Sequence, residues 1–331
     1  MNFEYLTKPI IIGNYIVKNR VVVPPMANFV LRKGNGKIKP EHLDFYEKYA
    51  VGGAGLIIIE ACSVIKTTDI LSVYDDECIY GMSQLAKCLS KKGAVVIVQL
   101  IHEGLSILKE TEISQISKNR FLEYKKMFID AAVRCKKAGF AGIELHAAHG
   151  FYLNQILERN SRTDEYGGTF ENRVRIVQEL IAEIKKTCGK DFIVSVRFGN
   201  QNLSELKETA IAIEKSGADL LNISTGCGEY QNIPLKFPFD NKIYASSLVK
   251  NYVHIPVVCV GNITNGAQAE TILKNNYADM VAVGRGHLCD PSWTNKVISG
   301  EQPITCKNCR ICMWYIDGKK CPAKRKEKMN K

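Results

Sequence analysis

The sequence of 331 residues lacks features that would make it a membrane or secreted protein. No stretch approaches the roughly 20 consecutive apolar residues that a helix needs to span a bilayer. The first residues, MNFEYLTKPIIIGN, do not combine a basic leader with a long apolar run, so we expect no signal peptide. Both absences favour a cytoplasmic protein without a membrane partner.

The positive charge is not spread evenly along the chain, although the formal net charge is +11. The last thirteen residues, KKCPAKRKEKMNK, hold seven Lys or Arg and one Glu, which leaves only +5 for the other 318 residues. We interpret this tail as a solvated chain end rather than as a contact surface for an acidic partner. The charge therefore does not indicate nucleic-acid binding.

Short apolar runs alternate with helical patterns along the chain. The runs are rich in Val and Ile and apolar on both faces, as expected of parallel strands covered by helices. Helical patterns lie between them, and several end at Gly. We predict strands at 20–25, 55–60, 94–99, 141–145, 192–197, 218–224, 256–261 and 278–284, and helices at 41–53, 81–93, 121–139, 171–189 and 265–277.

No Pro/Ser-rich linker divides this alternation, and the first strand ends in PPMAN rather than in a G-x-G-x-x-G turn of an open sheet. Eight strands alternating with helices over about 280 residues favour an α/β protein with a (β/α)8 TIM barrel. We predict this barrel over residues 1–300 and a short cysteine-rich extension with a basic tail over 301–331. The chemistry of such a barrel lies at the C-terminal ends of its strands.

Polar and small residues occupy the predicted strand ends. Gln99 can both donate and accept hydrogen bonds, which suits a ring with alternating C=O and N–H groups. Arg197 ends an apolar strand and needs an electron-rich partner. Gly261 and Gly284 expose backbone N–H groups near Arg285, where barrels commonly hold phosphate. These groups could hydrogen-bond to one another at the barrel rim. The presence of glycines together with two arginines favours a ligand site instead.

Five segments resemble the Old Yellow Enzyme superfamily: KNRVVVPPMAN, GGAGLIIIEA, VVIVQLIHEG, GIELHAAHGFYLNQIL with NSRTDEYGGTFENR, and ADMVAVGRGHLCDP. The resemblance covers about residues 3–300 and is greatest to the branch of 2,4-dienoyl-CoA reductase and related NADH:flavin oxidoreductases. It implies FMN bound noncovalently over the barrel mouth. By position, the flavin contacts would be Pro24, Pro25, Met26, Ala27, Ala61, Gln99 and Arg197, and the phosphate contacts Gly261, Gly284 and Arg285.

The HAAH motif supplies two candidate catalytic histidines, His146 and His149. In the superfamily this pair receives the carbonyl oxygen of an α,β-unsaturated carbonyl substrate, and hydride passes from flavin N5 to the β-carbon. Two donors at a developing enolate oxygen could contribute about 3–4 kcal/mol each, by analogy with oxyanion holes. A zinc site on this pair would lack a third ligand of suitable spacing.

The sequence departs from the superfamily at the proton donor. Where relatives carry a Tyr that protonates the substrate α-carbon, this chain has Phe151, followed by Tyr152. Either a re-aimed Tyr152 or water supplies the proton, or the alkene-reduction step differs. Ala27 and Leu105 also replace a polar residue and an Arg. We therefore expect an atypical substrate or reaction in the oxidative direction.

The C-terminal run CKNCRICMWYIDGKKC gathers four cysteines with the spacing C-x2-C-x2-C-x8-C. Thiols stay reduced in the cytoplasm, so a metal site is favoured over a disulfide framework. Four thiolates suit tetrahedral zinc or an iron–sulfur cluster. The reductase branch carries a [4Fe-4S] motif here with slightly wider spacing, so the resemblance favours this cluster over zinc or unligated thiols. Its ligands would be Cys306, Cys309, Cys312 and Cys321.

The electron donor and the reaction leave alternatives open. Larger members of the branch continue into an FAD- and NAD(P)H-binding domain, whereas only ten residues follow Cys321 here. We expect a separate reductase or ferredoxin-like donor, with direct reduction by NAD(P)H as the alternative, and a homo-oligomer. A tRNA dihydrouridine synthase is less favoured, since its N-x-G-C-P-like loop and helical RNA-binding domain are not evident. A non-catalytic flavin and iron–sulfur electron carrier would explain Phe151.

Overall fold

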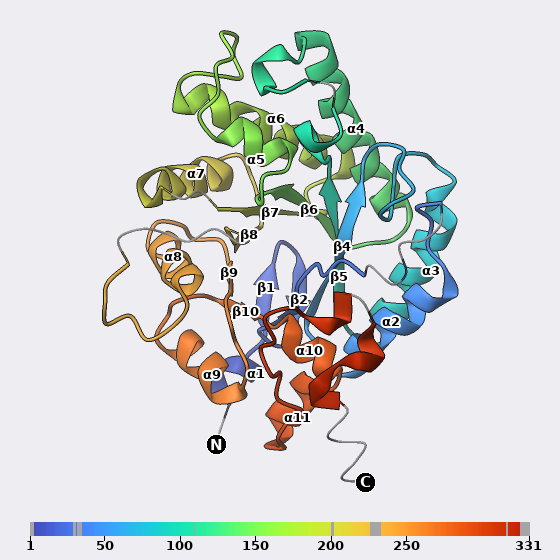
Figure 1. Cartoon of the computed structure of the whole chain (residues 1–331), viewed down its shortest axis with the longest axis vertical. Helices are drawn as coiled ribbons and strands as arrows, with labels where there is room; N and C mark the ends of the chain where they lie inside the picture. The colour runs from blue at the N-terminus through green and yellow to red at the C-terminus, as the bar shows by residue number, and fades with distance from the viewer. Residues whose placement is uncertain are drawn as a thin grey trace.

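The computed structural model describes residues 3–28, 31, 35–108, 110–199, 202–225, 233–315 and 317–324. Eight parallel strands close into a barrel in the order β10-β3-β4-β5-β6-β7-β8-β9 (Figure 1). All eight predicted strands and the (β/α)8 barrel are confirmed. The strands are β3 (Val21–Val23), β4 (Leu56–Ser63), β5 (Val95–Ile101), β6 (Gly142–Ala147), β7 (Ile193–Phe198), β8 (Leu220–Ile223), β9 (Val257–Val260) and β10 (Met280–Ala282).

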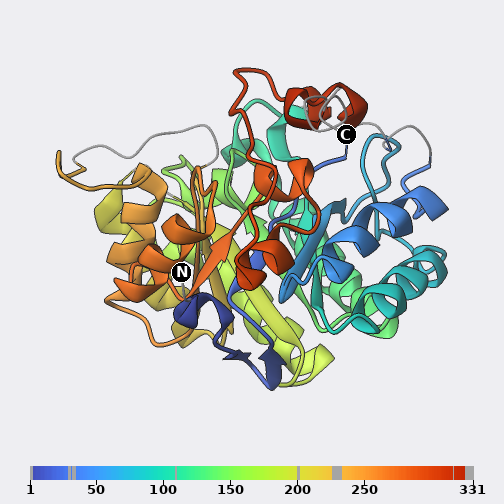
Figure 2. The ribbon, with the colours of Figure 1, turned by 90° about the horizontal axis from the view of Figure 1, so that it is seen from below.

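Helices surround the barrel on its outside, as Figures 1 and 2 show. α6 illustrates why these segments are helical: Thr169 caps its N-terminus, and Gly189 follows its last residue with a φ of 87°. Its apolar residues recur at helical spacing and are buried against the strands. The larger outer helices are α2 (Pro40–Val51), α3 (Cys78–Ser90), α4 (Lys118–Lys137), α6 (Phe170–Cys188), α7 (Leu203–Lys215), α8 (Asn241–Lys250) and α9 (Gly266–Lys274).

An N-terminal hairpin, which the sequence patterns did not predict, covers one end of the barrel. It consists of β1 (Ile10–Ile12) and β2 (Tyr15–Val17), and it lies at the lower side of Figure 2. Ile12 and Val17 are fully buried and join the apolar cluster inside the barrel. The hairpin escapes sequence prediction because each of its strands is only three residues long.

The cysteine segment lies on the opposite side of the molecule from this hairpin (Figure 2). It follows the short helices α10 (Arg285–Cys289) and α11 (Trp293–Ser299) and contains two 3-10 turns, Met313–Tyr315 and Gly318–Lys320. Asp290 accepts a hydrogen bond from the backbone N–H of Ile304 at 3.0 Å and so holds the start of the segment against the barrel. Residues 325–331 of the basic tail lie outside the described residues.

Strand register places two layers of side chains inside the barrel near its C-terminal end. Gln99 pairs with Glu144, and Glu144 with Ser195. Two residues further along, His146 pairs with Arg197, and Arg197 with Asn222. Because residues two apart point to the same side of a strand, both layers face the barrel interior. Among the described helices, none is both long and apolar enough to cross a membrane.

Candidate active site

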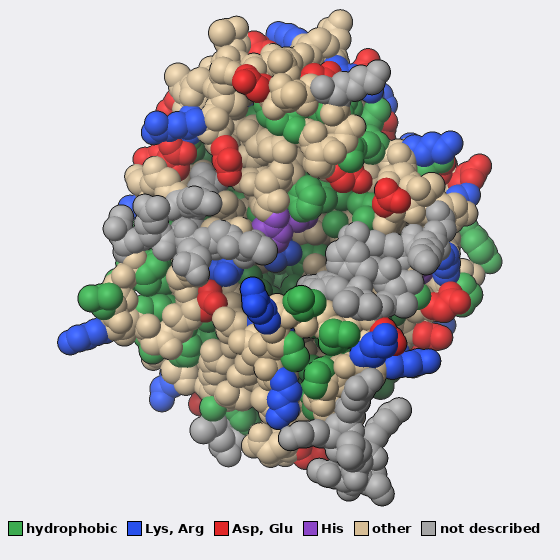
Figure 3. Space-filling model, viewed as in Figure 1, with side chains coloured by type: hydrophobic (Ala, Val, Ile, Leu, Met, Phe, Trp, Pro, Cys, Tyr) green, Lys and Arg blue, Asp and Glu red, His purple; other side chains and the backbone are tan. Residues whose placement is uncertain are grey.

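The two histidines of the HAAH motif meet at the C-terminal end of β6. His146 lies in the strand, and His149 follows with a left-handed φ of 63°, which turns its ring back toward the barrel. The ring centroids are 4.9 Å apart at 81° to each other. In Figure 3 a histidine side chain borders the hollow near the centre of the face, next to Lys or Arg atoms.

Both histidines are neutral in this environment. Burial, with smaller contributions from His149 and Arg197, holds the pKa of His146 well below its usual value. Burial and the charge of Arg197 lower the pKa of His149 to about 3. Each ring can therefore donate one N–H without carrying a charge. Nδ1 of His146 is buried without a hydrogen-bond partner in the described part of the chain.

A buried carboxyl organises the layer below. Glu144 is fully buried and accepts hydrogen bonds from Gln99 Nε2 at 2.8 Å, from Ser195 Oγ at 3.0 Å and from Asn222 Nδ2 at 3.0 Å. Burial raises the pKa of Glu144, partly offset by the charge of Arg197. Since the Gln99 amino group is committed to Glu144, its carbonyl oxygen is left to accept a hydrogen bond from a ligand.

Arg197 joins this layer to the histidines. Its Nη2 donates to Ser224 Oγ at 3.2 Å, and the same hydroxyl lies 2.9 Å from Nε2 of His149. Burial lowers the pKa of Arg197, with Glu144 acting in the opposite sense. Within the described residues, Arg197 Nε and Asn222 Oδ1 are buried without partners. Buried polar groups in native proteins are nearly always hydrogen-bonded, so this cluster fits a polar ligand at the barrel mouth.

A cavity of about 160 Å³ lies where the sequence predicts the phosphate. Arg285 donates to Asn262 and to Asn308, which holds its guanidinium between the barrel and the cysteine segment. A Cβ atom on Gly261 would lie 2.8 Å from Asp240, so this position requires glycine. The lining includes Met26, Gly261, Asn262, Gly284, Arg285 and Cys306.

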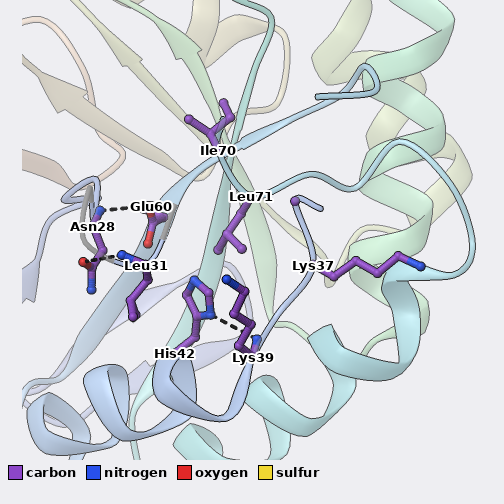
Figure 4. A pocket seen from close by; sticks show the side chains of 9 residues that line it. Asn28, Leu31, Lys37, Lys39, His42, Glu60, Ile70 and Leu71 are labelled. Atoms are coloured by element: carbon purple, nitrogen blue, oxygen red, sulfur yellow. Dashed lines mark hydrogen bonds between the residues drawn. The ribbon is translucent and has the colours of Figure 1, made fainter. Parts of the chain in front are cut away.

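The segment after β3 is held by a glutamate that the sequence predictions did not include. Glu60, within β4, accepts a hydrogen bond from the backbone N–H of Asn28 at 2.9 Å, and both residues line a small pocket (Figure 4). The backbone N–H of Glu60 donates to the Tyr46 hydroxyl at 2.9 Å. Glu60 thereby positions the chain next to Ala27, which is half-buried like Pro25, Met26 and Ala61.

Tyr152 does not join the two histidines. Its ring packs 4.9 Å from His102 and 5.4 Å from Tyr124. Its hydroxyl is buried without a hydrogen-bond partner among the described residues, and burial raises its pKa well above the usual value. Phe151 instead faces His146, with ring centroids 4.9 Å apart. The side chain that packs on His146 is therefore a phenyl ring, which has no proton to donate.

The predicted cysteines line one small cavity of about 20 Å³, together with a fifth that the spacing did not indicate. Cys289 ends α10, and its Sγ lies 3.8 Å from Sγ of Cys321. The described cysteines are free thiols, and no three His, Cys, Asp or Glu side chains of the described residues form a preassembled metal site. The thiols around the cavity are Cys289, Cys306, Cys309, Cys312 and Cys321.

Comparison with known proteins gives a match over almost the whole chain. The NADH:flavin oxidoreductase / NADH oxidase family matches residues 5–303. The NADH oxidase of Thermoanaerobacter brockii is 34% identical over 340 residues, which cover 91% of this chain and 52% of that protein. The NADPH dehydrogenase of Bacillus subtilis is 33% identical over 312 residues, which cover 86% of this chain and 92% of that one. This chain thus spans about half the length of the first relative and most of the second.

Solved structures share the fold. A 2-naphthoyl-CoA reductase in complex with 2-naphthoyl-CoA superimposes with a TM-score of 0.84 at 24% identity, covering 95% of this chain and 56% of that chain. Morphinone reductase in complex with tetrahydroNAD gives a TM-score of 0.78 at 20% identity, covering 94% of this chain and 96% of that chain. At these identities the likeness shows the fold alone.

Proposed function

The chain belongs to the NADH:flavin oxidoreductase / NADH oxidase family and is an FMN-dependent oxidoreductase of the Old Yellow Enzyme superfamily, and from this premise we propose an ene-reductase type of reaction. Bound FMN would exchange hydride, through its N5, with the β-carbon of an enone or enoyl thioester. The observation that carries the proposal is the pair of neutral imidazoles, His146 and His149, next to unpaired buried polar atoms of the barrel mouth.

The flavin site draws on two groups of residues. Gln99, oriented by Glu144, would accept a hydrogen bond from the flavin ring. The buried guanidinium of Arg197 needs an electron-rich partner, and the flavin ring would be that partner. The cavity beside Arg285 would receive the phosphate. The proposed FMN contacts are Pro24, Pro25, Met26, Ala27, Ala61, Gln99, Arg197, Gly261, Gly284 and Arg285.

The histidines would hold the substrate carbonyl oxygen. Because Arg197 donates to Ser224 Oγ, the Ser224 hydroxyl proton can point at Nε2 of His149. In this arrangement the His149 proton would lie on Nδ1, and this nitrogen would act as a donor. Each neutral imidazole still carries one N–H. It can donate a hydrogen bond to the negative charge that develops on the carbonyl oxygen and so stabilise that charge.

The proton for the α-carbon is assigned to water in this proposal. Phe151, which faces His146, has no proton to give, and the Tyr152 hydroxyl is packed among aromatic rings. Tyr152 as the acid remains the competing hypothesis, and replacing Tyr152 by Phe separates the two.

Electrons would come from NAD(P)H, in keeping with the names of the relatives, or from a separate reductase or ferredoxin-like donor by way of a [4Fe-4S] cluster. The support for the cluster is the chemistry of its donors, since five thiols line one cavity. Among the described residues, no three thiols form a preassembled metal site. The ligands in this proposal would be Cys306, Cys309, Cys312 and Cys321.

The test is anaerobic reoxidation of the FMN-loaded, reduced protein by an activated enone, an enoyl thioester and a nitroalkene. We expect His146→Ala and His149→Ala each to keep FMN and to slow reoxidation about 10²–10³-fold. Gln155→Ala, which removes a side chain that donates to the backbone oxygen of Gly150 at 2.6 Å, next to His149, serves as the control for a general disturbance. Unchanged rates in both histidine variants would contradict the proposed role.

A non-catalytic electron carrier is the second candidate, because Phe151 occupies the position next to His146. It is favoured if none of the three acceptors reoxidises the reduced parent protein while a one-electron acceptor does so rapidly.

A further inference from the structure

The walls of the phosphate cavity come from two parts of the chain. The loops after β9 and β10 supply most of the lining, whereas Cys306 and Asn308 belong to the cysteine extension. The start of the extension is fixed to the barrel by the buried carboxylate of Asp290, which accepts hydrogen bonds from the backbone N–H of Ile304 at 3.0 Å and from Lys296 Nζ at 2.8 Å. Asn308 is therefore brought to the cavity by a segment that is anchored shortly before it.

Two asparagines hold the guanidinium of Arg285 at this cavity. Nη1 donates to Oδ1 of Asn308, and Nη2 donates to Oδ1 of Asn262. Both asparagines have a left-handed backbone, with φ angles of 49° and 43°. Asparagine adopts this conformation more readily than most residues with a side chain. A guanidinium has five N–H donors, so those that the asparagines do not use are left for an anion in the cavity.

The two carboxamides differ in the donors that they have left. Asn262 uses both ends within the protein, because its Nδ2 donates to Asp240 Oδ2 at 2.9 Å. Asn308 uses its Oδ1 for Arg285, and its Nδ2, on the same carbon, donates to no acceptor among the described residues. The backbone N–H of Asn308 donates to Cys306 Sγ at 3.4 Å, which fixes the turn that carries the side chain. The wall of the cavity thus presents a neutral donor beside a cation.

Resting on the proposed flavin site, we propose that Asn308 binds the phosphate of FMN. Its Nδ2 would donate to a phosphate oxygen, while its Oδ1 keeps the guanidinium of Arg285 next to the same group. A phosphate monoester has three terminal oxygens and nearly two negative charges at neutral pH, so it can accept from both side chains at once. The flavin site would then extend beyond the barrel, and the phosphate would join the barrel to the extension.

The experiment is a titration of the flavin-free full chain with FMN and with riboflavin, which lacks the phosphate, followed by fluorescence quenching. We expect Asn308→Ala to weaken FMN binding about tenfold, because it removes a hydrogen bond to a charged group, and to leave riboflavin binding unchanged. Asn276→Ala is the matched control, since Asn276 is also exposed and has a left-handed φ of 56°. This control should leave the affinity for both flavins unchanged.

A double variant separates direct binding from an effect through Arg285. In an Arg285→Ala background, loss of Asn308 Nδ2 should still weaken FMN binding at least about threefold. No further loss in this background, or an equal loss of FMN and riboflavin affinity in Asn308→Ala, would overturn the direct contact.

The parent protein distinguishes this inference from the proposed flavin site. A parent that binds neither flavin, or that binds FMN no more tightly than riboflavin, would overturn the phosphate cavity together with the role of Asn308. A parent that prefers FMN, with the same preference in Asn308→Ala, would overturn this inference alone.

Discussion

The barrel mouth and the cysteine extension place their polar groups and thiols in different ways. At the mouth, neighbouring strands fix each polar side chain, and Glu144 alone accepts three hydrogen bonds from them. The extension has two 3-10 turns, and no three thiols of its described residues form a preassembled metal site. The comparison teaches that strand register fixes the polar side chains of the mouth more closely than the turns fix the thiols of the extension.

The largest effect is expected at Glu144. Glu144→Ala would leave the buried donors of Gln99, Ser195 and Asn222 without an acceptor, so we expect the free energy of unfolding to fall by about 3–5 kcal/mol. Chemical denaturation with urea measures the change. Glu144→Gln keeps the side-chain volume and one acceptor oxygen, so its free energy of unfolding should fall clearly less. A loss below about 1 kcal/mol in Glu144→Ala would mean that the mouth is not organised by this carboxyl.

Arg285 is expected to have the next largest effect, because it contacts both regions. Arg285→Ala removes a charged donor from the phosphate cavity and from Asn262 and Asn308. Charged hydrogen bonds contribute about 1.5–3 kcal/mol, so FMN affinity should fall roughly 10- to 150-fold in fluorescence titrations. Arg310→Ala, in the same extension, is the matched control. Equal FMN affinity in the Arg285 variant and the parent would exclude a phosphate at this cavity.

The buried histidines predict a pH dependence of stability. Burial lowers the pKa of His149 to about 3 and that of His102 and His287 to about 4, below the unfolded value near 6.5. Between those values the unfolded chain binds more protons, so stability falls as pH decreases from about 6.5 to 4. Each histidine contributes at most about 1.4 kcal/mol per pH unit.

Denaturation at several pH values measures this slope, and His287→Gln should reduce it. A free energy of unfolding that stays constant over the window would show that these histidines are not buried in the neutral form.

The smallest effect is expected at Tyr152. Tyr152→Phe removes a buried hydroxyl without a partner among the described residues, so stability should change little and turnover less than about twofold. A tenfold slower reoxidation by an enone would instead identify Tyr152 as the proton donor, since general acids contribute about 10²–10⁴-fold. His146→Ala provides the reference for a large effect in the same assay.

The strands and the mouth can be predicted from the sequence for a physical reason. The apolar runs are long enough to show the alternation, and strand ends in a barrel converge on one face, so Gln99, His146 and Arg197 can be grouped from the sequence alone. The three-residue strands of the hairpin carry too short a pattern to be recognised.

Contacts that depend on three-dimensional proximity cannot be predicted in this way. Nothing in the run after Cys306 points to Cys289, because the helix that carries it approaches the extension only in the fold. The buried carboxyl of Glu144 lies inside an apolar run and gives no separate signal. Tyr152 is adjacent to the expected position in sequence, but the turn after His149 places Phe151 against the histidines instead.

The most direct measurement is titration of the flavin-free protein with FMN, followed by fluorescence quenching, for the parent and for Cys312→Ala. Since barrel strands fix the polar side chains of the mouth, and Cys312 does not line the phosphate cavity, we predict stoichiometric, saturable binding to both proteins with affinities that agree within about threefold. Failure of the parent to bind FMN, or binding that requires Cys312, would contradict the account.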